Sequence, residues 1–205
     1  MGMNSGSVIH LYPDEVNAKD SVGDDGYLER VKTMFGERCL RGTALVATTK
    51  ENGIVKMEDC EPFLRHLFNQ IRPWLAVEIG TLFGVTTALL AHYSDHVYSI
   101  DINHQQLASY ISHYFGVDRK ITNHIVSGDE EKAVVLSKLD FDFAFIDAVH
   151  TYDGVKGDFE CVKKCGRVLF HDYGMERFGG VTKFVDELPE DEVLKKPPFA
   201  FWQRR

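Results

Sequence analysis

The sequence is poor in cysteine, and the cysteines that it has lack the spacing of a zinc or redox site. Its 205 residues include four, Cys39, Cys60, Cys161 and Cys165, and the closest two are separated by four positions within a helical pattern. Zinc knuckles and redox motifs place two cysteines three positions apart, so a zinc role is only a remote alternative. We expect four reduced thiols, because a chain of this length can bury a sufficient core without disulfides.

Long apolar runs are also missing, and the first residues do not resemble a signal peptide. No stretch approaches the roughly 18 uncharged apolar residues that a membrane span requires. The start, Met1 to Ser7, lacks the basic-then-apolar order of a signal peptide. We therefore expect a cytoplasmic protein with no membrane partner.

Basic residues are outnumbered: 23 Lys and Arg stand against 31 Asp and Glu, a formal net charge of −8. An acidic chain is not attracted to polyanions, so we expect no nucleic-acid partner. With 44% hydrophobic and 26% charged residues, the composition is typical of a folded globular domain and excludes a disordered or fibrous one.

The first part of the chain predicts an N-terminal arm and cap segment over residues 1–56, followed by the main domain over 57–205. Residues 1–23 are polar and rich in Gly, Ser and Asn, which is typical of a loosely docked arm. Apolar spacing predicts helices over 27–40 and 57–71, with a loop at 50–53. Two roles stay open for residues 1–72: capping a pocket, or forming a homodimer contact.

From Trp74 onward, short apolar runs alternate with helical stretches. Strands are predicted at 75–79, 97–101, 122–126, 141–146 and 167–170; helices at 85–93, 105–115, 130–139 and 179–188; and an edge strand at 199–205. This order predicts an α/β fold with a doubly wound, mostly parallel sheet. Such sheets bind ligands at the carboxyl ends of their strands, so the residues that follow each strand are the candidate site.

The first strand leads into a glycine turn, Glu78-Ile79-Gly80-Thr81-Leu82-Phe83-Gly84. Glycines at both ends let the backbone turn tightly and expose main-chain amides to a ligand. A dinucleotide site requires a further glycine between them, where Leu82 stands, so a pyrophosphate fits poorly. The Glu78 carboxylate favours a cationic or zwitterionic ligand instead.

The next two strand ends also carry carboxylates. Asp101 lies 21 residues beyond Gly80, the place where a carboxylate can accept the hydroxyls of a ribose, although turn and cap roles are common for such a residue. Gly128 and Asp129 follow the third strand. They suit an adenine edge or the cap of the next helix equally well.

Three motifs occur in order: Val77 to Gly84, then Tyr98-Ser99-Ile100-Asp101, then Phe141 to Asp147. Together they resemble the class I S-adenosylmethionine-dependent methyltransferases. The segments Ile146-Asp147-Ala148-Val149-His150-Thr151-Tyr152 and Gly166 to Asp172 resemble a small bacterial group that is similar to the catechol and caffeoyl-CoA O-methyltransferases. The resemblance implies a Rossmann-like methyltransferase fold with seven strands and an N-terminal helical extension.

The resemblance also implies the activity and its ligands. It implies S-adenosyl-L-methionine as the cofactor and O-methylation of a small-molecule acceptor. The cofactor-binding positions that it implies are Glu78, Gly80, Thr81, Gly84, Asp101, Ile102, Gly128, Asp129 and Asp147.

Catalysis is expected beyond the fourth strand, at Asp147 and His150. His150 is the candidate general base, because the unperturbed pKa of histidine lies near neutrality. The catechol-like relatives hold a divalent metal with two aspartates, which match Asp147 and Asp172, and with an asparagine, where this chain has Tyr173. The candidate metal ligands, for Mg²⁺ or a similar ion, are therefore Asp147, Asp172 and His171. The alternative is that Asp172 and His171 bond to nearby backbone and shape the acceptor pocket.

Two other functions remain open on the sequence. A nicotinamide-dependent oxidoreductase would share the strand order and the ribose carboxylate, although the missing glycine argues against it. A Rossmann-like module without methyltransferase activity would keep the fold and bind a nucleoside or a protein partner.

Overall fold

The computed structural model describes residues 26–40, 43–51, 54–103 and 106–205. The arm predicted over residues 1–23 lies outside these ranges. Within them, every helix is too short or too polar to span a lipid bilayer.

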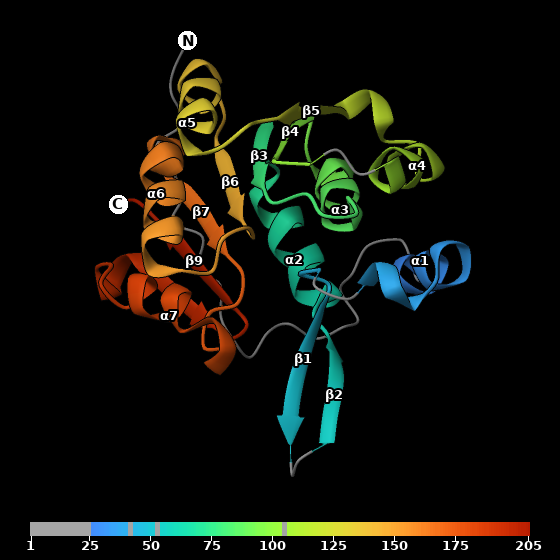
Figure 1. Ribbon diagram of the computed structural model, residues 1–205, viewed down its shortest axis with the longest axis horizontal. Helices are drawn as coiled ribbons and strands as arrows, with labels where there is room; N and C mark the ends of the chain where they lie inside the picture. Colours follow the sequence, from blue (N-terminus) through green and yellow to red (C-terminus); the bar gives the residue numbers. More distant parts are fainter. Residues whose placement is uncertain (1–25, 41–42, 52–53, 104–105) are drawn as a thin grey trace.

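The N-terminal part combines helices with a two-stranded hairpin. The order is α1 (Tyr27–Phe35), the 3₁₀ turn η1 (Glu37–Leu40), β1 (Val46–Glu51), β2 (Ile54–Asp59) and α2 (Glu61–Ile71). β1 and β2 pair antiparallel, and Figure 1 shows them extending away from the rest of the molecule. The helix predicted from residue 57 therefore begins at Glu61, because residues 57–59 belong to β2. The sequence carries the hairpin signal, Asn-Gly between β-branched runs, at positions where only a loop was predicted.

Part of the predicted cap segment belongs to the core of the main domain. Tyr27, Val31, Leu40 and Leu45 have no exposed surface and pack with the residues of α2 and α3 (Val85–Tyr93). The Tyr27 hydroxyl donates a hydrogen bond to the Val85 carbonyl at 2.7 Å. α1 is thus built into the domain, although the boundary after residue 56 stays a prediction.

The large sheet has seven strands in the order β5-β4-β3-β6-β7-β9-β8. The strands are β3 (Leu75–Ile79), β4 (His96–Asp101), β5 (Ile121–Ile125), β6 (Phe143–Ile146), β7 (Arg167–Phe170), β8 (Val193–Lys196) and β9 (Phe199–Gln203). The five strands β5, β4, β3, β6 and β7 run parallel to one another, whereas β9 runs antiparallel to both β7 and β8. The mostly parallel seven-stranded sheet is confirmed. The prediction of an edge strand at 199–205 is wrong, because β8 takes the edge and β9 is buried beside it.

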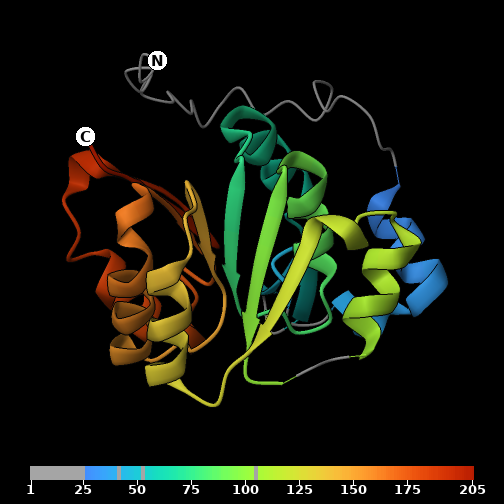
Figure 2. The same ribbon diagram turned by 90° about the horizontal axis from the view of Figure 1, so that it is seen from above.

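Helices cover both faces of the sheet (Figure 2). α2, α3 and α4 (Gln106–Tyr114) lie on one side; α5 (Asp129–Lys138), α6 (Tyr152–Val162) and α7 (Gly179–Val185) lie on the other. Short 3₁₀ turns complete the elements: η2 (Asp118–Lys120), η3 (Lys163–Cys165), η4 (Glu176–Phe178) and η5 (Glu190–Glu192). Each face has its own apolar core, with Phe68 and Phe143 in one and Phe159 and Trp202 in the other.

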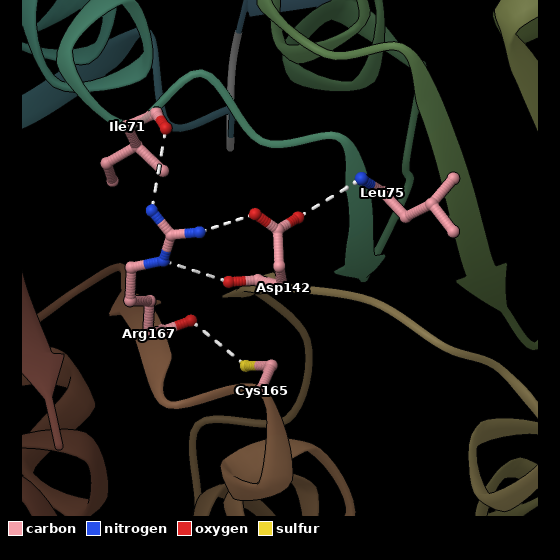
Figure 3. Close-up of polar contacts among 5 residues, drawn as sticks. All are labelled: Ile71, Leu75, Asp142, Cys165 and Arg167. Carbon is pink, nitrogen blue, oxygen red and sulfur yellow. Dashed lines mark hydrogen bonds and ion pairs between the residues drawn. The ribbon is translucent and has the colours of Figure 1, made fainter. Parts of the chain in front are cut away.

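A polar cluster ties the amino ends of the central strands together (Figure 3). The Asp142 carboxylate accepts a hydrogen bond from the Leu75 amide at 3.1 Å and forms an ion pair with Arg167. Arg167 also donates to the carbonyls of Asp142 at 3.0 Å and Ile71 at 3.5 Å. The cluster connects α2 with the amino ends of β3, β6 and β7. Beside it, burial raises the pKa of the Cys165 thiol to about 11, and all four cysteines are free thiols.

Candidate functional site

A cavity of about 500 Å³ opens at the carboxyl ends of β3, β4, β5 and β6. It lies where the strand order reverses between β3 and β6, the position at which doubly wound sheets bind ligands. Its size is within the usual range of small-molecule pockets, about 300–1,000 Å³. Its lining includes Gly80, Thr81, Asp101, Ile102, Gly128, Asp129, Asp147 and His150, which the sequence predicts, and Thr43, Leu82, Lys132 and Val149, which it does not.

The glycine turn after β3 is pressed against the end of β6. Gly80 has a φ of 96°, and a Cβ atom there would overlap the backbone carbonyl of Asp147. Gly84 has a φ of 75°, and a Cβ there would lie 2.8 Å from the Cβ of Ala108 in α4. Only glycine fits these two positions, which lets the turn pack closely on β6 and α4, and Gly80 itself lines the cavity.

Asp101, at the end of β4, holds the glycine turn. Its Oδ2 accepts hydrogen bonds from the amides of Thr81 at 2.9 Å and Leu82 at 3.1 Å, and its Oδ1 accepts one from the Asn103 amide at 3.0 Å. A carboxylate offers about four acceptor positions, so about one remains for a ligand hydroxyl. The sequence indicated the ribose role and left a turn role open, but the bonds to Thr81 and Leu82 could not be predicted, because they depend on how β4 is paired with β3.

Glu78 lies behind the turn. Its side chain is 1% exposed, it accepts a hydrogen bond from the Thr87 hydroxyl of α3, and it is not among the described residues that line the cavity. Burial raises the pKa of this carboxyl well above its usual value, and the charges of Asp147 and Asp101 raise it further. Its predicted contact with the cofactor stays a prediction, and the geometry places it in a supporting position.

At the end of β5, an ion-pair network reaches the cavity. Lys132, on α5, is 9% exposed, and its ammonium lies 2.7 Å from Asp129 Oδ1 and forms a second ion pair with Asp158 of α6. Asp129 is the first residue of α5, and the residue in the cap position is Gly128. Asp129 therefore does not cap the helix, which was one of its two predicted roles, and its carboxylate pairs with Lys132 instead. Lys132 lowers the pKa of Asp129 by a hydrogen bond and by its charge.

Two imidazoles and two carboxylates meet beyond β6 and β7. His150 Nε2 lies 2.6 Å from Asp172 Oδ2 and 4.0 Å from Asp147 Oδ1. His171 Nδ1 lies 3.0 Å from Asp147 Oδ1 and 3.5 Å from Asp172 Oδ2. Asp172 adopts a left-handed backbone conformation with a φ of 62°, which costs energy for a residue with a side chain. The structure therefore brings together all four residues that the sequence proposed for catalysis and metal binding.

The charges in this cluster are fixed by mutual contact. Burial alone would lower the pKa of His171, but Asp147 and Asp172 raise it to about 10. Burial alone would raise the pKa of Asp172, but hydrogen bonds from His150 and His171, and the charge of His171, lower it to about 2. Near neutral pH, His171 is thus an imidazolium between two carboxylates.

In addition to the two carboxylates, an aromatic ring contacts His150. Phe178 of η4 stacks on the imidazole with ring centroids 4.1 Å apart. Gly180 permits this approach, because a Cβ there would overlap the His150 carbonyl and the Tyr152 amide. The His150 side chain remains 33% exposed, so the ring is oriented and still accessible from the cavity that it lines.

The candidate metal ligands differ from the predicted set in one residue. Ligand atoms of Asp147, His150 and Asp172 all lie within 4.8 Å of one another. His171 is not in this group: its Nδ1 is bonded to Asp147, and its Nε2 is buried without a hydrogen-bond partner among the described residues. The geometry thus favours His150 over His171 as the nitrogen ligand, and metal binding itself stays a prediction.

Comparison with protein families finds a match over residues 77–173 to the model described as a methyltransferase domain. The matched region contains the glycine turn, Asp101, Asp129 and the His150–Asp172 cluster. The resemblance to the class I methyltransferases is thereby confirmed. Comparison with curated proteins found no match.

Solved structures similar to this one share its fold. The O-methyltransferase TomG from Streptomyces achromogenes, involved in tomaymycin synthesis and solved in complex with SAM, is 16% identical, with a TM-score of 0.61 over 92% of this chain and 94% of that one. An O-methyltransferase from Bacillus cereus in complex with SAH is 17% identical, with a TM-score of 0.61 over 91% and 94%. The SAH-bound methyltransferase PaMTH1 from Podospora anserina is 14% identical, with a TM-score of 0.61 over 98% and 99%.

Proposed function

We infer that this chain, which carries a class I S-adenosylmethionine-dependent methyltransferase domain, transfers a methyl group to the hydroxyl of a small-molecule acceptor. One observation carries the proposal. A turn that admits only glycine at Gly80, a carboxylate at the next strand end and an oriented imidazole all line one cavity at the switch point of the sheet.

The cofactor side fits an adenosyl sulfonium better than a dinucleotide. The wall of main chain at Gly80 admits an amino acid moiety, and Asp101 keeps acceptor capacity for a ribose hydroxyl. Leu82 occupies the place where a nicotinamide site needs glycine, and it lines the cavity. The oxidoreductase alternative is therefore not favoured.

On the acceptor side, His150 is the general base. Asp172 engages its Nε2 at 2.6 Å, which leaves Nδ1 to take a proton, as in other paired imidazoles. S-adenosylmethionine supplies an electrophilic methyl carbon on a positively charged sulfur. The acceptor oxygen bonds to that carbon as the carbon–sulfur bond breaks, and its proton passes to His150.

A divalent cation would be held by Asp147, His150 and Asp172, where it would polarise the acceptor hydroxyl. We expect methyl transfer to persist in excess EDTA, because each carboxylate already has an imidazole partner. Activity that EDTA abolishes and Mg²⁺ restores would assign the site to a metal and make His150 a ligand.

The test of the proposed function is calorimetric titration with S-adenosylhomocysteine. We expect saturable binding to the wild type and loss of binding in Gly80→Ala, whose added Cβ overlaps Asp147. The matched control is Gly157→Ala, an exposed position on α6 with open space around it. A wild-type protein that binds neither S-adenosylmethionine nor S-adenosylhomocysteine would overturn the proposal, and thermal melting shows whether each variant is folded.

Of the two roles left open for residues 1–72, the cap has structural support. Thr43 precedes the β1–β2 hairpin and lines the cavity, and its hydroxyl donates to the Leu40 carbonyl at 2.9 Å. The N-terminal segment therefore contributes one wall of the ligand site. A homodimer contact remains the alternative.

A further inference from the structure

Lys132 lies at the end of the cavity that the proposed function leaves for the cofactor base. If the amino acid end lies at the β3 turn and the ribose at Asp101 of β4, the base extends toward β5. There the cavity is lined by Val126, Gly128, Asp129 and Lys132.

Two carboxylates from different helices hold the ammonium in place. Asp129 begins the same helix and is exposed, with 88% of its side chain accessible. Asp158 comes from α6, has no exposed surface, and pairs with the same Nζ. An ammonium has three N–H groups, and these two contacts leave one for a ligand.

A buried ion pair of this kind is weak evidence for a stabilising role. Removing a lysine and an aspartate from water carries a desolvation penalty that their attraction often fails to repay. Lys138, on the same helix, is exposed to solvent. What distinguishes Lys132 is that it lines the cavity and that its ammonium pairs with a buried carboxylate.

We propose that Lys132 is a specificity-determining residue that donates a hydrogen bond to a ring nitrogen of adenine, next to the exocyclic amine that the predicted cofactor-binding role of Asp129 would engage. This inference rests on the proposed function. Adenine presents this combination, since the amine lies beside ring nitrogens on either side. The ion pair with Asp158 holds the Lys132 ammonium in position before a ligand binds.

The test measures the affinity for S-adenosylhomocysteine and for its 1-deaza, 3-deaza and 7-deaza analogues by calorimetry. The wild type should bind one of the 1-deaza and 7-deaza compounds about 10-fold or more weakly, because a hydrogen bond from a charged donor is lost. The 3-deaza analogue is the ligand control, since N3 lies away from the amine.

The matching variant is the double substitution K132M/D158L, which replaces the buried pair by apolar side chains and so avoids an unpaired buried charge. We expect it to bind S-adenosylhomocysteine about 10- to 100-fold more weakly and to lose the discrimination between the analogues. The control K138M removes a charge from the exposed part of the helix and should bind like the wild type.

The outcomes are distinguishable. A wild type that binds S-adenosylhomocysteine and all analogues equally, or a folded K132M/D158L variant with wild-type affinity and discrimination, would refute the role of Lys132. A wild type that does not bind S-adenosylhomocysteine would refute the proposed function itself.

Discussion

At the residue scale, the properties of His150 are set by neighbours from two other segments. Asp172 fixes one nitrogen, and Phe178 stacks on the ring. A histidine held in this way keeps one tautomer and one orientation, and both serve proton transfer. The chemistry of His150 therefore depends on residues that lie more than twenty positions away.

His150→Ala should lower kcat about 10²- to 10⁴-fold, the usual contribution of a general base. The KM for S-adenosylmethionine should change little, because the glycine turn and Asp101 are untouched. Asp172→Asn should also lower kcat, since the ring loses its charged partner. Steady-state kinetics with an identified acceptor checks both, and unchanged turnover in His150→Ala would remove His150 from the mechanism.

His171 predicts a pH dependence of stability. Its pKa rises from 6.5 to about 10 on folding, so its contribution is fully present below about pH 6.5 and is lost as the pH rises through about 10. The free energy of unfolding of the wild type should fall relative to that of His171→Gln by up to about 1.4 kcal/mol per pH unit within this window.

Urea denaturation at several pH values measures this difference. An exposed histidine, His113, provides the control through His113→Gln, which should run parallel to the wild type. Parallel curves for the wild type and His171→Gln would contradict the assigned charge of His171.

At the scale of elements, the two ends of the parallel strands have different roles. The carboxyl ends of β3 to β6 form the cavity, whereas the Asp142–Arg167 cluster joins the amino ends of β3, β6 and β7 to α2. The charged residues at the carboxyl ends thus line the ligand cavity, and those at the amino ends stabilise the packing of the strands.

Arg167→Met should destabilise the fold by about 1–3 kcal/mol, because the Asp142 carboxylate, which is about three-quarters buried, loses its ionic partner. Affinity for S-adenosylhomocysteine should not change. Lys163→Met, which removes an exposed ion pair with Glu160, should cost at most about 1 kcal/mol. Chemical denaturation and calorimetry check the pair, and a loss of ligand affinity in folded Arg167→Met would contradict this separation of roles.

At the scale of the whole molecule, the N-terminal segment is part of both the core and the cavity. α1 packs its buried face on α3, and Thr43 reaches the ligand site. Ligand binding and the order of this segment should therefore be coupled.

Amide exchange should slow at residues 43–46 when S-adenosylhomocysteine is added, because a bound ligand closes that wall of the cavity. The effect should be independent of protein concentration. Exchange that responds to protein concentration and not to ligand would support the homodimer contact in place of the cap.

The sequence by itself determined the parts of the protein that depend on local pattern. Alternating apolar runs predicted the five strands between Leu75 and Phe170 and the helices α3, α4 and α5, but not α6, and the glycine turn predicted the place of the cavity. Each of these is set by residues that are close in the chain, where periodicity and turn chemistry act directly. The hairpin β1–β2 was missed although its local signal was present.

Only the tertiary structure decided which distant groups meet. The anchoring of Lys132 by Asp158, the bonding of Asp101 to the glycine turn and the pairing of His150 with Asp172 join segments that are 19 to 26 positions apart in the sequence. Likewise, β9 lies inside the sheet because β7 pairs with one side of it and β8 with the other. Such contacts follow from strand order and helix packing, which no local pattern records.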